Sequence, residues 1–214
     1  YDIPQEEVEV LLPSLIVLNR LLKYTVNDSI LLSNVLLSDA VMFEMLFPKE
    51  ASFVVKAYEE FTLQSATSIA ERFGRDLNHI SRVSSVALEI YDKMKKLHGY
   101  KLRERTLLQV SAILQDIGKY VNVKNHALLS YNTITNLDIV GINDHERLII
   151  ATVCYYHNGN IPSMDSPIYN QLSQEDRVMV SKLAAILQIS NAINTSHSPK
   201  FEQVNVNMKN GKLN

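Results

Sequence analysis

The sequence has few of the features that mark secreted or membrane proteins. Its single cysteine, Cys154, excludes an internal disulfide and agrees with a reducing compartment, where a buried thiol is the ordinary role. No apolar, uncharged stretch reaches the roughly 18 residues that a membrane span needs, and no charged-then-apolar signal begins the chain. We therefore expect a cytoplasmic protein that does not enter a membrane.

The chain also lacks an excess of either charge. Lys and Arg total 21 and Asp and Glu total 23, which gives a formal net charge of -2. This balance excludes bulk attraction to nucleic acid or to an anionic membrane, so a polyanion would need a local basic patch. Basic residues are not interleaved with aromatic ones, and no zinc or helix-turn-helix signature occurs. Nucleic acid is therefore not an expected partner.

Helical periodicity dominates what is present. Of the 214 residues 46% are hydrophobic, which is enough to bury a sizeable core. The clearest pattern begins at Asp76, which can cap a helix, and ends at Leu97, two residues before Gly99. Helices are predicted over residues 49–73, 76–97, 104–116, 128–137, 143–156 and 173–195. Together they predict a compact helical domain over residues 49–198.

Three of these helices carry sharper predictions. Gly118 is expected to break the period of the helix over residues 104–116. Asn143 and Glu146 form a capping-box pattern at the start of the next-to-last helix. In the last helix the apolar residues expected to face mostly inward are Val178, Val180, Leu183, Ala184, Leu187 and Ile193.

The two ends of the chain differ from its centre. Residues 5–24 are predicted to be helical, with Pro13 starting or kinking the helix, and residues 29–33 and 37–46 predict a strand and a helix. At the other end, Asn210-Gly211 follows an alternating stretch and indicates a hairpin, but only three residues remain after it. We expect the pairing strand to be missing or supplied by another part of the whole protein. Both ends, and the start at Tyr1, suggest a piece of something longer.

Polar residues with metal-binding chemistry follow one another along the predicted helices in an ordered series. They are His79, Gln115-Asp116, His126, His157 and Asn191. A His in place of Gln115 would complete a His-Asp dyad of the kind that holds a divalent ion. A single histidine at a helix end is usually satisfied or solvated, and the order of the series is what distinguishes these residues.

At these residues the sequence resembles the HD-type helical domain of the Ppx/GppA family, the exopolyphosphatases and guanosine pentaphosphate phosphohydrolases. The similar stretches are RERTLLQVSAILQDIGKYV, LSYNTITNLDIVGINDHERLIIATVCYYHNGNIP and KLAAILQISNAINTS. The resemblance, over about residues 4–208, implies a mainly α fold. Residues 1–48 would be the last helix-strand-helix of an actin-like α/β phosphatase domain, 49–198 an HD-like helical bundle, and 199–214 a short β segment.

The resemblance also implies a function. The parent enzyme would remove terminal phosphate from inorganic polyphosphate or guanosine pentaphosphate, with its catalytic carboxylate and its Mg²⁺ or other divalent cation in domains before Tyr1. No catalytic residue and no cofactor are expected in this chain, which would extend the substrate channel and contribute to a homodimer. The family's usual Leu-Arg-Glu-Gly appears here as Leu37-Ser38-Asp39-Ala40, a departure that bears on the parent's activity.

The candidate metal ligands are His79, Asp116 and His157. We expect this site to be degenerate, because the neutral amides of Gln115 and Asn191 replace the His and the Asp of the HD pattern. Leu129 also stands where relatives often have His. A buried hydrogen-bond acceptor is the simpler role for Asp116.

Phosphate binding is predicted at a basic cluster near the altered dyad. Arg82 lies one turn beyond His79, and Lys119 and Lys124 follow the Gln115-Asp116 turn. Further basic candidates are Arg103, Arg105, Arg147 and Lys182. Two alternatives stay open at this point: an active HD-type metal-dependent phosphohydrolase, and a sensor that binds a phosphate ligand without cleaving it.

Overall fold

The computed structural model describes residues 5–25, 41–42, 45–46, 52–195, 208–209 and 212–213. The chain divides into two compact units, residues 1–51 and residues 52–214. The predicted boundary between residues 48 and 49 lies close to this division, and the assignment of each part to a family domain stays a prediction.

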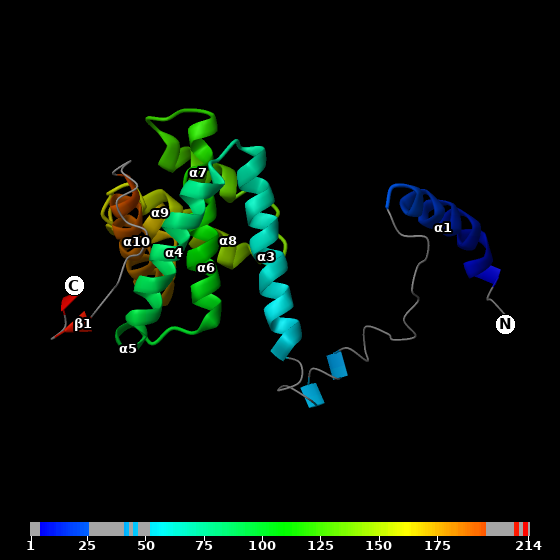
Figure 1. Ribbon diagram of the computed structural model, residues 1–214, viewed down its shortest axis with the longest axis horizontal. Helices are drawn as coiled ribbons and strands as arrows, with labels where there is room; N and C mark the ends of the chain where they lie inside the picture. Colours follow the sequence, from blue (N-terminus) through cyan, green and yellow to red (C-terminus); the bar gives the residue numbers. More distant parts are fainter. Residues whose placement is uncertain are drawn as a thin grey trace. The chain divides into compact units, whose positions relative to one another are not determined.

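The first unit contains helix α1, Gln5–Lys23, with Pro13 in its interior (Figure 1). Pro13 therefore does not start the helix, which was one of the two predicted roles, and the kink predicted as the other stays a prediction. Residues 41–42 and 45–46 are helical, in agreement with the prediction for 37–46 as far as they are described. The strand predicted over 29–33 lies outside the described residues.

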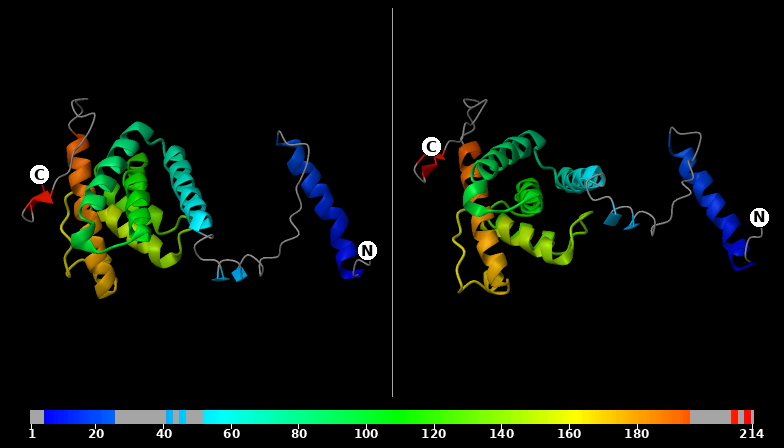
Figure 2. Two further views of the ribbon diagram at one scale, coloured as in Figure 1. Left: turned by 60° about the horizontal axis from the view of Figure 1, so that its bottom comes forward. Right: turned by 90° about the horizontal axis from the view of Figure 1, so that it is seen from below.

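The second unit is a bundle built around α6, Leu102–Leu114, which packs against α3, α4 and α8 (Figures 1 and 2). Helix α10 closes the bundle against α4 and α8. The other helices are α3 Ser52–Arg72, α4 Leu77–Lys93, α5 Lys95–His98, η1 Ile117–Tyr120 (a 3-10 helix), α7 His126–Ile134, α8 Asp144–Tyr156, α9 Pro167–Asn170 and α10 Gln174–Thr195. The mainly α fold predicted from the sequence is confirmed.

Helix α6 occupies the middle because its surface is apolar on almost every side. Leu108, Val110, Ala112 and Leu114 are all fully buried. A helix with that pattern has no face for solvent and must be surrounded by other elements. The end of α6 therefore places Gln115 and Asp116 in buried positions.

The helix predicted over residues 76–97 is divided in two. Asp76 caps α4 as predicted, with its side chain accepting a hydrogen bond from Asn78 N at 2.9 Å. At Met94 the backbone N–H is shared between the carbonyls of Ile90 and Tyr91, and α5 begins at the next residue. The two pieces then end at Gly99, whose φ of 70° is the left-handed conformation of a helix C-cap.

Gly118 has a different role from the one predicted. It lies within η1, where an added Cβ would come closer than 3.0 Å to His126 O, Ser130 N and the Leu129 side chain. Glycine is therefore required for the close approach of η1 to α7 rather than for ending α6. This contact brings the start of α7 next to the end of α6.

The ends of α8 and α10 follow the sequence patterns. Asn143 and Glu146 form the predicted capping box, with Glu146 N donating to Asn143 Oδ1 at 2.9 Å. Helix α10 begins after Ser173, whose Oγ accepts from Asp176 N at 3.1 Å. The inward face of α10 is as predicted except at Val178, which is 48% exposed because it lies outside the stripe formed by Val180, Leu183 and Leu187.

The carboxy-terminal residues form a short hairpin. Strand β1, Met208–Lys209, pairs antiparallel with β2, Lys212–Leu213, and Met208 lies opposite Leu213. The expectation that the pairing strand would come from elsewhere is wrong, because two residues after Gly211 are enough to close the pair. In the part of the chain that the structure describes, no helix is both long and apolar enough to cross a bilayer.

Candidate functional site

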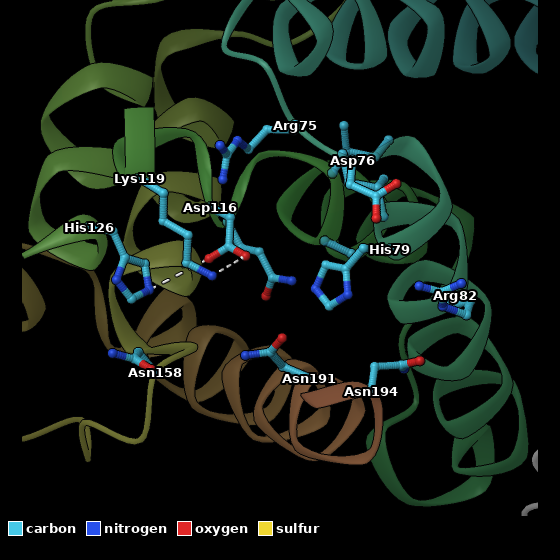
Figure 3. Close-up of a pocket in the computed structure, with 14 residues that line it drawn as sticks. Arg75, Asp76, His79, Arg82, Asp116, Lys119, His126, Asn158, Asn191 and Asn194 are labelled. Carbon is cyan, nitrogen blue, oxygen red and sulfur yellow. Dashed lines mark hydrogen bonds and ion pairs between the residues drawn. The ribbon is translucent and has the colours of Figure 1, made fainter. Parts of the chain in front are cut away.

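A pocket of about 340 Å³ lies in the second unit, between α4, α10 and the turn that follows α6 (Figure 3). The turn brings Gln115, Asp116 and Lys119 to the pocket wall, and α7 contributes His126 from its first residue. The lining residues are Arg75, Asp76, His79, Ile80, Arg82, Ala112, Ile113, Gln115, Asp116, Lys119, His126, Asn158, Asn191 and Asn194. Its polar lining therefore comes from segments far apart in the sequence.

Asp116 is the acidic group at the floor of this pocket. Lys119 Nζ donates to its Oδ2 at 2.6 Å, while its Oδ1 lies 3.4 Å from His157 Nε2 and 3.5 Å from His126 Nε2. The last two contacts are electrostatic rather than hydrogen bonds, since Oδ1 has no hydrogen-bond partner. Burial raises the pKa of Asp116, but the His157 imidazole in its protonated form and the Lys119 ammonium group outweigh burial and hold this pKa well below its usual range. Asp116 is therefore a carboxylate at neutral pH.

The two histidines next to Asp116 are fixed by backbone carbonyls. His126 Nδ1 lies 2.7 Å from Val123 O, and His157 Nδ1 lies 2.5 Å from Cys154 O. A carbonyl oxygen only accepts, so each Nδ1 must carry the proton. In the neutral rings both Nε2 atoms then present lone pairs, and these atoms lie 3.3 Å apart. Burial lowers the pKa of His126 and so favours its neutral form.

The turn itself is held by Ser130 of α7. Its Oγ donates to Gln115 O at 2.7 Å and accepts from Gly118 N at 2.9 Å. Gln115 is almost completely buried, and its Oε1 has no hydrogen-bond partner. The backbone at the end of α6 is thus anchored while two buried oxygens, one on Gln115 and one on Asp116, lack donors.

Two arginines line the pocket. Arg82 comes from α4, and Arg75 precedes that helix with its Nε donating to Phe73 O at 3.2 Å (Figure 3). Within the described residues, neither guanidinium forms an ion pair with a carboxylate. His79 lies between them on α4, and burial lowers its pKa, so its imidazole is neutral at pH 7. The arginines are therefore available to an anion.

The pocket lies within residues 63–214, which match the family model described as Ppx/GppA phosphatase, domain III. The match covers 152 of the 214 residues. The chain belongs to the Ppx/GppA phosphatase family. The resemblance seen in the sequence is thereby confirmed, and the chain is related to the exopolyphosphatases and guanosine pentaphosphate phosphohydrolases.

The predicted phosphate-binding residues of this Ppx/GppA chain do not all meet. Arg82 and Lys119 line the pocket, whereas Lys124 is exposed and lies outside the lining. The four further candidates have other contacts: Arg103 binds Glu146, Arg105 binds Asp92, Arg147 binds Asp144, and Lys182 lies over the Tyr100 ring. Arg75, which was not among the residues predicted from the sequence, is the third basic side chain in the pocket lining, with Arg82 and Lys119. Its place just before the Asp76 cap was the available signal.

The predicted metal ligands are also divided in this Ppx/GppA domain. Asp116 and His157 lie together, but the third ligand atom in reach is on His126, and the three atoms lie within 4.8 Å of one another. His79 lines the same pocket without belonging to this group. The sequence series contained His126, but only the packing of η1 on α7 shows that it faces Asp116.

Proposed function

We propose that this chain is the carboxy-terminal part of an exopolyphosphatase-like hydrolase and that its pocket binds the phosphate chain of the substrate. The substrate would be inorganic polyphosphate or guanosine pentaphosphate. The observation that carries the proposal is the pocket itself: Arg75, Arg82 and Lys119 surround it within a Ppx/GppA domain III.

Charge supports this assignment. The pocket is lined by the cations Arg75, Arg82 and Lys119 and by the anions Asp76 and Asp116, so its formal charge is +1 with neutral histidines. Asp76 caps α4, and Lys119 binds Asp116. The two guanidinium groups are therefore the main source of positive charge in the pocket. Guanidinium groups match phosphate oxygens in two-point hydrogen bonds.

Size and the remaining polar groups agree with a phosphate chain. A volume of about 340 Å³ is in the range of pockets that bind small ligands. Asn158, Asn191 and Asn194 line the side toward α8 and α10, and their amide groups can donate to phosphate oxygens without adding negative charge (Figure 3). Hydrolysis would take place in the upstream domains, and this part would hold the chain and contribute to a homodimer.

The proposal is tested by polyphosphate binding to the 214-residue chain. Arg82→Ala should weaken the affinity by about tenfold, the effect of losing one charge-assisted contact of about 1.5 kcal/mol. Arg72→Ala is the matched control, because Arg72 is an exposed arginine at the end of α3 outside the pocket lining. Titration calorimetry at fixed salt measures both. Equal affinities in the two variants would contradict the proposed site.

A further inference from the structure

Three side-chain atoms that can donate electron pairs converge beside the pocket: Asp116 Oδ1, His126 Nε2 and His157 Nε2. Each of His126 and His157 uses its Nδ1–H on a backbone carbonyl, so in the neutral form of each ring the Nε2 atom faces Asp116 Oδ1 as an electron-pair donor. Metal-binding histidines almost always donate the other ring N–H to a carbonyl or a carboxylate, which is the arrangement of both rings. The rings are thus oriented as ligands before any ion is considered.

The distances fit an ion. The three pairs of atoms are 3.3, 3.4 and 3.5 Å apart. In a tetrahedral site with metal–ligand bonds of about 2.0–2.1 Å, neighbouring ligand atoms lie about 3.3 Å apart. A dication placed at bonding distance from all three atoms therefore needs almost no movement of the protein.

The buried oxygen of Asp116 adds independent evidence. Its Oδ1 is inaccessible to solvent and has no hydrogen-bond partner. An unpartnered buried oxygen is costly, and its neighbours on this side are two more electron-pair donors. A proton on one Nε2 would relieve one of these contacts, whereas a dication satisfies all three atoms at once.

From this geometry we propose that Asp116, His126 and His157 bind one first-row transition-metal dication, such as Zn²⁺ or Mn²⁺. Two imidazoles and one carboxylate suit these ions, while Mg²⁺ and Ca²⁺ favour sites made of oxygen ligands. The site goes beyond the proposed phosphate binding, and it revises the expectation that no cofactor binds in this chain.

The surroundings leave coordination positions of such an ion open to the pocket. Asp116 and His126 belong to the pocket lining, so the remaining coordination positions face the pocket, while His157 is buried behind them. Lys119 binds the other carboxylate oxygen, which leaves Oδ1 for the ion. This ligand set does not use Gln115, Asn191 or His79, so the amides that replace the HD-pattern residues do not weaken it.

The test compares His126→Gln with His79→Gln in the 214-residue chain. Each chain is stripped with a chelator and titrated with Zn²⁺ alone, and bound metal is measured by elemental analysis and calorimetry. The unchanged chain and His79→Gln should bind about one equivalent, and His126→Gln should bind at least about tenfold more weakly. His79→Gln is a matched control because it removes an imidazole from the same pocket.

A second variant, Asp116→Asn, and a spectroscopic probe, Co²⁺, test the same site independently. Asparagine keeps the shape of Asp116 and should also lower the affinity at least about tenfold, with circular dichroism confirming that both variants stay folded. Co²⁺ bound by the unchanged chain should give visible absorption bands that persist in His79→Gln and are lost in His126→Gln. Failure of the unchanged chain to bind an equivalent of metal would overturn the proposal. So would loss of binding in His79→Gln, or full binding in His126→Gln. None of these results depends on polyphosphate.

Discussion

At the scale of single residues, Gly118 decides how the polar groups of the site meet. Its missing side chain lets η1 approach the backbone of α7 at His126 and Ser130. Ser130 in turn holds the carbonyl of Gln115 and the amide of Gly118. The positions of Asp116 and His126 relative to each other therefore depend on the close contacts that Gly118 and Ser130 make between η1 and α7.

Replacing Gly118 by alanine should destabilise the chain by about 2 kcal/mol, because the new methyl group overpacks a backbone contact. In an ordinary helix the same change would stabilise by about 1 kcal/mol, so even the sign of the effect tests the packing. The free energy of unfolding in urea measures it. Gly159→Ala is a useful comparison, since that glycine has φ 87° but nothing near its added Cβ, and it should cost only backbone strain. A stabilised Gly118→Ala chain would contradict this account.

The sequence predicted part of this site. The predicted set of His79, Asp116 and His157 contains two of the three side chains that converge, since helical spacing places Asp116 at the end of a buried helix. His126 could not be assigned, because its direction is set by the η1–α7 contact between residues that periodicity does not pair. Lys124 lies outside the pocket lining for a similar reason: it follows Lys119 closely in sequence but lies in an exposed turn.

At the scale of elements, α8 is tied to α6 by a charged contact at its first turn. Arg103 donates to both carboxylate oxygens of Glu146, at 2.6 and 2.5 Å, and to Gly141 O at 2.7 Å. Glu146 also completes the capping box by accepting from Asn143 N. The capping pattern was visible in the sequence, but the partner of Glu146 was not, because Arg103 lies 43 residues away.

This contact predicts a dependence of stability on pH. Burial raises the pKa of Glu146, but Arg103 and the Asn143 amide outweigh it, so the folded-state pKa is lowered. The stabilising contribution is therefore complete above the unfolded pKa of about 4.3 and is lost as the pH falls through the lower folded value. Glu146→Gln should cost about 1–2 kcal/mol at pH 7 and little at pH 3. Urea unfolding at both values measures the difference.

Glu175→Gln is the control for this prediction, because Glu175 is an exposed acid in the first turn of α10. It should change the unfolding free energy by less than about 0.5 kcal/mol at either pH. A Glu146→Gln chain whose loss of stability is the same at pH 3 and pH 7 would show that the charge of Glu146 does not contribute.

Helix boundaries show where periodicity was sufficient and where it was not. The starts of α4, α8 and α10 follow from side-chain caps that the sequence displays. The break at Met94 does not, because the apolar stripe continues across it and only the shared backbone hydrogen bond marks the change to α5. Pro13 inside α1 is a comparable case, because the loss of one backbone hydrogen bond at a proline does not by itself decide where a helix ends.

At the scale of the whole molecule, the described polar site lies in the part that matches domain III of the Ppx/GppA phosphatases. In the function we propose, chemistry and substrate retention are divided between different parts of one enzyme. The pocket then adds binding energy that is the same in the ground state and in the transition state. Such uniform binding lowers KM without raising kcat.

The proposed separation of catalysis from substrate retention makes a prediction for the full-length protein. It should release phosphate from polyphosphate, while the 214-residue chain alone should release none. In the full-length protein Arg82→Ala should raise KM by about tenfold for long polyphosphate and leave kcat unchanged, because in the proposed function only a long chain would reach both the catalytic domains and this pocket. Phosphate release from chains of different lengths measures both constants. Arg72→Ala should leave them unaltered, and a fall in kcat without a change in KM would place Arg82 in the chemical step instead.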